Sequence, residues 1–136
     1  MGEVDQAAIA ADFIRRWRAW AATHDPAGAA AMFADNPTLM SPVFHGPKQS
    51  KDYAVAVVCH ALAVFENFRY VSEWSSDDGV ILGFEANVGP HQLRGVDRFR
   101  LDDQGRVTEL EVMIRPLNAL AEVGERMKAR FAASAA

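Results

Sequence analysis

GVDRFRLDDQGRVTELEVMIRP, residues 95–116, is the stretch whose alternating pattern decides the fold. Before the DDQG turn, Asp97, Phe99 and Leu101 share one parity, and the arginines between them share the other. Successive side chains of a β-strand point to opposite faces of its sheet. Because the arginines belong on the solvated face, the sequence predicts that the carboxyl group of Asp97 lies on the apolar side.

The segment after the turn supports this direction for Asp97. With residues 102–105 as the hairpin loop and Gly105 at a positive φ, Leu101 pairs with Arg106. In that register Asp97 lies opposite Leu110, which belongs to the apolar parity of the last strand. The two strands therefore agree that Asp97 points inward.

The outer face of the predicted hairpin carries charges of both signs. The same register places Arg98 opposite Glu109 and Val96 opposite Glu111. Opposite charges across neighbouring strands stabilise a solvated sheet surface. The stripe of arginines is thus explained as a solvated or subunit-facing surface rather than an anion-binding site.

Length and composition predict one globular domain over residues 1–136. Half of the residues are apolar, enough for a hydrophobic core. The single Cys59 excludes an internal disulfide, and the amino-terminal residues lack a secretory pattern, so we expect a cytoplasmic protein. The longest apolar run, residues 54–65, is too short to span a bilayer. A net charge of −4 without a Lys/Arg run argues against nucleic acid as a partner.

Hydrophobic periodicity in the rest of the chain predicts that most helices precede most strands in the sequence. Helical spacing predicts helices over residues 3–23, 26–33 and 50–65 and after Pro116, and alternation predicts strands over residues 38–44, 68–74 and 80–88. Asn36–Pro37 ends the second helix, and residues 132–136 fray. Within residues 68–74, Phe68, Tyr70 and Trp74 take one face.

This element order resembles that of the nuclear transport factor 2-like superfamily, in its SnoaL-like and ketosteroid-isomerase-like branch. The matching segments are AAMFADNPTLMSPVFHGP, residues 30–47, and the hairpin of residues 95–116. The resemblance implies an α+β fold, in which a cone-shaped, curved antiparallel or mixed sheet wraps around N-terminal helices and a C-terminal helix is added. Members commonly pair through the outer sheet face, where Val96 and Met113 predict a homodimer.

The resemblance also assigns roles to single positions. Asp97 takes the place of an aspartic acid that stays protonated and donates a hydrogen bond to a developing oxyanion. Trp17 takes the place of the tyrosine that shares this oxyanion hole. Ser41 takes the place of the general base, and a hydroxyl group is no base near pH 7. His45, in the following loop, is the candidate replacement.

The leading hypothesis is a small-molecule enzyme that works without a cofactor. Asp97 acts as acid or oxyanion donor on a small, largely apolar ligand during isomerisation, dehydration, cyclisation or hydrolysis. The expected pocket is lined by Phe13, Trp17, His60, Phe84, Phe99, Val112 and Ile114. The four histidines show no zinc spacing and no glycine-rich phosphate loop is present, so neither a metal nor a cofactor is expected.

Each candidate also has a purely structural explanation. Asp97 can be a buried carboxyl group held by backbone or indole N–H groups, and Trp17 and His60 can be core residues. Ser41 can be a small residue where packing leaves little room, and His45 an ordinary loop histidine. The alternative function is accordingly a noncatalytic ligand-binding or dimeric interaction domain that has lost the family's general base.

Overall fold

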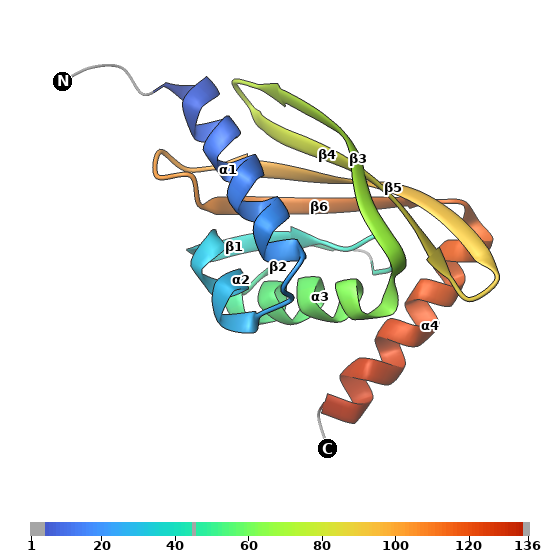
Figure 1. Cartoon of the computed structure of the whole chain (residues 1–136). Coiled ribbons are helices and arrows are strands. Elements are labelled where there is room, and N and C mark those ends of the chain that lie inside the picture. The colour runs from blue at the N-terminus through green and yellow to red at the C-terminus, as the bar shows by residue number, and fades with distance from the viewer. Residues whose placement is uncertain (1–4, 45, 135–136) are drawn as a thin grey trace.

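The computed structural model of the chain describes residues 5–44 and 46–134 (Figure 1). Four helices and six strands make up this described part. The helices are α1 (Gln6–Ala21), α2 (Pro26–Met32), α3 (Lys51–Val64) and α4 (Leu117–Ser134). The strands are β1 (Phe33–Met40), β2 (Lys48–Gln49), β3 (Glu66–Ser76), β4 (Gly79–Val88), β5 (His91–Leu101) and β6 (Val107–Arg115). They form one mixed sheet of order β2-β1-β6-β5-β4-β3, in which only β1 and β6 run parallel. The predicted α+β class, with its additional C-terminal helix, is confirmed.

Helix starts follow the capping residues that the sequence offers. The Asp25 side chain accepts a hydrogen bond from the backbone N–H of Ala27, and Pro26 is the first residue of α2. The Ser50 hydroxyl accepts one from the backbone N–H of Tyr53 at the start of α3. Asp and Ser are favoured at this position because their side chains satisfy N–H groups that have no partner within the helix, and proline suits the first helical residue.

The first strand begins five residues earlier than the sequence predicts. β1 starts at Phe33, where α2 has already ended, and includes Asn36–Pro37. The pairing of β1 with β6 shifts its register between Phe33 and Thr38, so Pro37 occupies an irregularity where its missing N–H is tolerated. The expected break at Asn36–Pro37 is therefore wrong, because a strand bulge accommodates the proline.

The β5–β6 hairpin keeps the predicted faces but has a different register. Asp97 lies opposite Val112, and Arg98 opposite Glu111, two residues further along β6 than expected. The loop extends to Arg106, whose carbonyl accepts from the N–H of Asp102, and a bulge shifts the register between Arg100 and Leu101. Each irregularity shifts the register by one residue, so together they restore parity.

The hairpin agrees with the sequence prediction at Gly105 and in the direction of Asp97, and differs from it in the partner of Val96. Gly105 has the predicted positive φ, 75°. Val96 pairs with Met113 instead of Glu111. Asp97 nevertheless points inward, as the alternation indicated, and is 8% exposed.

A bulge in β3 redirects one aromatic side chain. Tyr70 pairs with Phe84, but Ser72 pairs with Gly83, so the register of β3 shifts between the two pairs. Beyond this bulge Trp74 lies on the outer face and is 55% exposed. The predicted common face for Phe68, Tyr70 and Trp74 is therefore wrong for Trp74 and holds for the other two.

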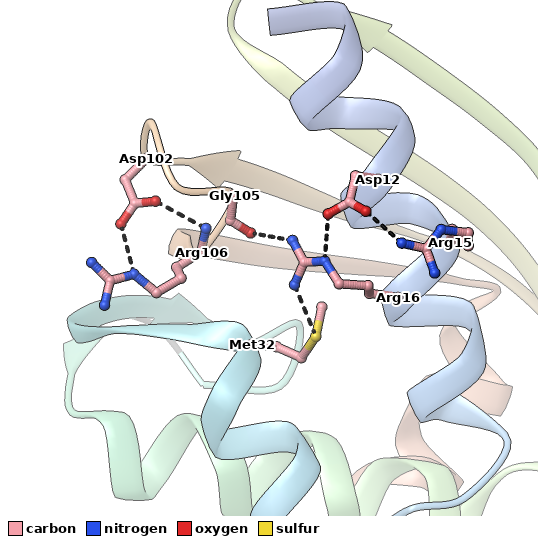
Figure 2. A network of polar contacts seen from close by, with 7 residues as sticks. All are labelled: Asp12, Arg15, Arg16, Met32, Asp102, Gly105 and Arg106. Atoms are coloured by element: carbon pink, nitrogen blue, oxygen red, sulfur yellow. Dashed lines mark hydrogen bonds and ion pairs between the residues drawn. The ribbon is translucent and has the colours of Figure 1, made fainter. Parts of the chain in front are cut away.

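Arg16 connects α1 with the turn between β5 and β6 (Figure 2). Its guanidinium group pairs with Asp12 at 2.7 Å and donates to the carbonyl of Gly105 at 3.1 Å. A third N–H contacts the sulfur of Met32 on α2. These contacts hold α1 against the β5–β6 turn, which fixes the helix that carries Trp17.

α4 follows the last strand and packs against α3 and the sheet (Figure 1). It includes residues 132–134 of the tail that was expected to fray, and residues 135–136 lie outside the described part. Within the described residues no helix has the length and apolar character needed to cross a membrane. Together, α1, α3 and α4 cover the inner face of the sheet and enclose the candidate site.

Candidate active site

A cavity of about 450 Å³ lies on the inner face of the sheet. Its wall is mainly apolar, with Leu39, Phe65, Phe68 and Phe84 among the residues that form it. α3 and α4 close its sides, and the segment after β1, including Ser41, contributes to its edge. A cavity of this size and character suits a small organic ligand.

Three polar side chains form a chain of hydrogen bonds in the wall of this cavity. The indole Nε1–H of Trp17, on α1, donates to the Tyr70 hydroxyl at 2.8 Å. The Tyr70 hydroxyl, on β3, donates to Oδ2 of Asp97 at 2.7 Å. All three residues line the cavity, so the chain of donors ends on a carboxyl group that faces the ligand space.

The direction of these bonds is fixed by the chemistry of the groups. An indole nitrogen can only donate, so the oxygen of Tyr70 must accept from Trp17. The single hydrogen of Tyr70 is then directed to Asp97 and is not available to a ligand. Oδ1 of Asp97 receives no hydrogen bond from any described residue. This oxygen is not completely buried, so it is accessible from the cavity. The free oxygen of Asp97 is therefore the acidic atom that a ligand can reach.

Burial changes the acidity of both titratable groups in the chain. Loss of solvent raises the pKa of Asp97 to about 7, and the hydrogen bond from Tyr70 opposes this increase. Burial is the main cause that raises the pKa of Tyr70 well above its ordinary value, and the adjacent charge of Asp97 is the second. Near pH 7 Asp97 thus exists in both forms, and only the protonated form can donate a hydrogen bond or a proton.

The predicted pocket residues divide into a lining and a supporting layer. Trp17, Phe84, Val112 and Ile114 line the cavity as expected. Phe13 and Phe99 are fully buried and lie outside the lining, which corrects their expected place. Their rings pack edge-to-face at 4.9 Å between centroids, and Phe99 packs on Trp17 at 4.8 Å. These ring contacts between α1 and β5 hold the indole in place from behind.

The other predicted polar residues occupy three different situations. Ser41 lines the cavity, and its Oγ accepts a hydrogen bond from the backbone N–H of Val43 at 3.0 Å. His60 lies outside the lining; its Nδ1 accepts from Arg130 Nε at 3.0 Å, because its ring is turned toward α4 and packs on Phe131. His45 lies outside the described residues.

Trp17 reaches Asp97 only through Tyr70, which is not among the site residues predicted from the sequence. The indole and the carboxyl group share no direct hydrogen bond, because Tyr70 stands between them. Tyr70 and Asp97 lie on β3 and β5 with β4 between them, so the pairing of neighbouring strands does not predict their contact. The available signal was the inward parity of Tyr70 together with Phe68.

The structure also bears on metal binding. Among residues 5–44 and 46–134, no three His, Cys, Asp or Glu side chains gather in an arrangement that fits a metal ion. The chemical capacity of the site lies in Asp97 and its supporting hydrogen bonds.

Solved structures of known proteins share this architecture. A steroid delta-isomerase from Pseudomonas aeruginosa is 34% identical, with a TM-score of 0.89, over 97% of this chain and 98% of that protein. A protein with a cystatin-like fold from Silicibacter pomeroyi is 28% identical, with a TM-score of 0.82, over 87% and 84% of the two chains. A candidate SnoaL-like polyketide cyclase from Jannaschia is 12% identical, with a TM-score of 0.68, over 90% and 95%, and it shows likeness of fold alone.

Two other comparisons gave no match. No protein-family model matches the chain, and no curated protein sequence matches it significantly. The relationship to the Pseudomonas isomerase, which extends over almost the whole of both chains, therefore carries the assignment.

Proposed function

This chain belongs to the nuclear transport factor 2-like superfamily, in its SnoaL-like and ketosteroid-isomerase-like branch, and from that membership we propose a cofactor-independent enzyme of the isomerase type. Its substrate is a small, largely apolar compound with a carbonyl oxygen. Asp97 donates a hydrogen bond, or a proton, to that oxygen as negative charge develops on it.

The observation that supports this proposal is the buried carboxyl group at the end of the hydrogen-bond chain. Tyr70 occupies Oδ2 of Asp97 and leaves Oδ1 for the ligand. The cavity around it is mostly apolar, so charge interactions there are weakly screened. An acid with a pKa of about 7 in such a place is suited to proton transfer near neutral pH.

The general base is a separate part of the proposal. Ser41 lines the cavity, but its hydroxyl group is too weak a base to take up a proton near pH 7. His45 follows the lining residue Phe44 in the sequence and is the candidate base. Replacing His45 by Gln should therefore lower turnover more than it lowers ligand affinity.

The test uses a β,γ-unsaturated steroid ketone, chosen because the 34% identical relative is a steroid delta-isomerase. Isomerisation moves one proton from carbon to carbon, and the conjugated product is followed by its ultraviolet absorbance. We expect turnover by the native protein and a loss of roughly a hundredfold or more in Asp97→Asn. Tyr53→Phe, which removes the other tyrosine hydroxyl of the cavity wall, serves as the control.

The dependence of this reaction on pH is a second readout. Because only protonated Asp97 can donate, kcat/KM should fall as the pH rises through about 7. Equal turnover of the native protein and Asp97→Asn on a confirmed substrate would refute the role of Asp97.

A noncatalytic ligand-binding domain is the second candidate. It is favoured by the absence of another Asp or Glu, beside Asp97, from the described part of the cavity wall. Calorimetric binding of the steroid ketone without any turnover would identify this alternative.

We also propose that two copies pair through the outer sheet face. Val96 pairs with Gly83 and Met113, and Trp74 lies over Gly83, so these side chains form an apolar row across four strands. Trp74 and Met113 are 55% and 43% exposed. Sedimentation should give a dimer for the native chain and a monomer for Trp74→Glu; a native monomer at high concentration would refute the pairing.

A further inference from the structure

Two of the three lysines in the sequence line the cavity. Lys48 belongs to β2, at the edge of the sheet, and Lys128 belongs to α4. Both residues are exposed to solvent, whereas Asp97 is buried in the same cavity. Exposed lining residues mark the mouth and buried ones mark the interior. The lysines therefore lie in the solvent-exposed part of the cavity and Asp97 in its buried part.

Aromatic contacts connect the two lysines along one part of the mouth. The Nζ of Lys48 lies 4.6 Å from the ring centroid of Tyr53. The Tyr53 ring stacks on Phe131, with 6.1 Å between centroids. Lys128 precedes Phe131 by three residues on α4, a spacing that places both on one side of the helix. Lys48 and Lys128 thus flank the same aromatic pair.

The charge of this mouth differs from that of the whole chain. The chain has a net charge of −4, and its described cavity lining contains both lysines but no acid other than Asp97. Neither lysine forms an ion pair with another described residue, while most arginines do. A negatively charged group at the mouth would find two cations there, and the described lining contains no carboxylate besides that of Asp97.

We propose that the ligand is an amphipathic keto acid, whose apolar body fills the cavity and whose carboxylate binds beside Lys48 and Lys128. Its carbonyl group, at the other end, reaches Asp97. The contact between the carbonyl group and Asp97 rests on the proposed function, whereas the contact between the carboxylate and the two lysines is new. The volume of about 450 Å³ corresponds to on the order of 15 groups of water size. A chain or ring system of that size spans from an exposed mouth to a buried acid.

The test compares three probes that differ in one group. They are a straight-chain tridecanoate with a methyl ketone at its far end, the methyl ester of that keto acid, and tridecanone. Binding to the full chain is measured by calorimetry at low and at high salt. Two exposed ion pairs predict that the acid binds about fivefold more tightly than its ester. Salt should reduce this preference.

Lysine variants show where the preference arises. In the double variant Lys48→Ala, Lys128→Ala, affinity for the acid should fall to that for the ester, and affinity for the ester should stay unchanged. Lys51→Ala removes the same charge from the one lysine outside the lining and should leave the preference intact. This matched control separates a local contact from a general effect of net charge.

The outcomes distinguish this inference from the proposed function. If the ester and ketone bind but the acid binds no more tightly, the inference is overturned and the role of Asp97 stands. An equal loss of acid and ester affinity in the double variant would also overturn it, because the lysines would then act by packing. If no probe binds and the steroid ketone is not turned over, both proposals fail.

Discussion

Tyr70 donates its only hydroxyl hydrogen to the buried carboxyl group of Asp97, across 2.7 Å and from a strand that is not adjacent in the sheet. This contact requires the sheet to curve, because β4 lies between the two strands. It also decides which oxygen of Asp97 remains for a ligand. The acid is thus held in a fixed orientation by a residue that itself has no free donor.

Asp97→Asn should change how the stability of the fold depends on pH. The folded pKa of about 7 exceeds the ordinary value of 3.8, so the folded state binds the proton more tightly than the unfolded state. Stability therefore falls as the pH rises from about 4 to about 7, by roughly 4 kcal/mol in total. Asparagine retains an acceptor for Tyr70 but does not ionise.

Urea unfolding at pH 5 and pH 8 measures this effect. The free energy of unfolding of the native protein should decrease more over this range than that of Asp97→Asn, and the other titrating groups cancel in the difference. Parallel pH profiles for the two proteins would show that Asp97 is not ionised at a cost in the folded state.

Tyr70→Phe should make Asp97 a weaker acid. The phenol hydrogen bond lowers the pKa of Asp97, so its removal should move the midpoint of the pH profile above that of the native protein. The variant also leaves the Trp17 N–H without its acceptor, at a cost of about 1–3 kcal/mol in stability. Both the pH–rate profile and urea unfolding report these changes.

Tyr53→Phe is the matched control for this substitution. Tyr53 also lines the cavity, but no hydrogen bond of its hydroxyl to a described residue is present. The pH midpoint should therefore stay where it is in the native protein. A midpoint in Tyr70→Phe that also stays unchanged would exclude the Tyr70 hydrogen bond as a control on acidity.

Gly95→Ala should destabilise the fold and alter the cavity wall. A Cβ at Gly95 would lie 2.4 Å from Cζ of Phe84 and 2.6 Å from the carbonyl oxygen of Met113. The ring of Phe84 lines the cavity, so it must move if the methyl group is added. Overpacking of this kind costs about 1–3 kcal/mol.

Gly124→Ala gives the opposite expectation within the same chain. Its Cβ would meet Val43 at 3.4 Å, an ordinary contact, on an α-helix where alanine is favoured over glycine by about 1 kcal/mol. Thermal unfolding of both variants should show a lower Tm for Gly95→Ala and an equal or higher Tm for Gly124→Ala. Equal stability of the two would contradict the close packing of Phe84 over Gly95.

Local alternation was sufficient to predict the direction of Asp97. The side-chain period of a strand survives two irregularities of one residue each, so the inner face was correct although the hairpin register was not. Between Tyr70 and Trp74 the strand β3 contains only one such irregularity, so the parity was not restored and Trp74 turned to the outer face. Such bulges depend on pairing with another strand, which local composition does not encode.

The site was less accessible to sequence reasoning than the fold. Trp17 was selected because it takes the place of a tyrosine in the family that the chain resembles, and it does line the cavity. Its hydrogen bond to Tyr70 joins residues 53 positions apart. Phe13 and Phe99 face inward like the lining residues, and only the packing of their rings between α1 and β5 places them behind the wall. Periodicity predicts which face a residue takes, but not its depth.

The acidity of Asp97 itself is the most direct test of this account. With aspartate labelled at its carboxyl carbon, and with Asp97→Asn used to identify the resonance, NMR follows the carboxyl group as the pH is changed. We predict a titration midpoint near 7 in the folded protein. A midpoint near the ordinary value of 3.8 would show a solvated, ionised carboxylate at neutral pH and would contradict its role as a donor.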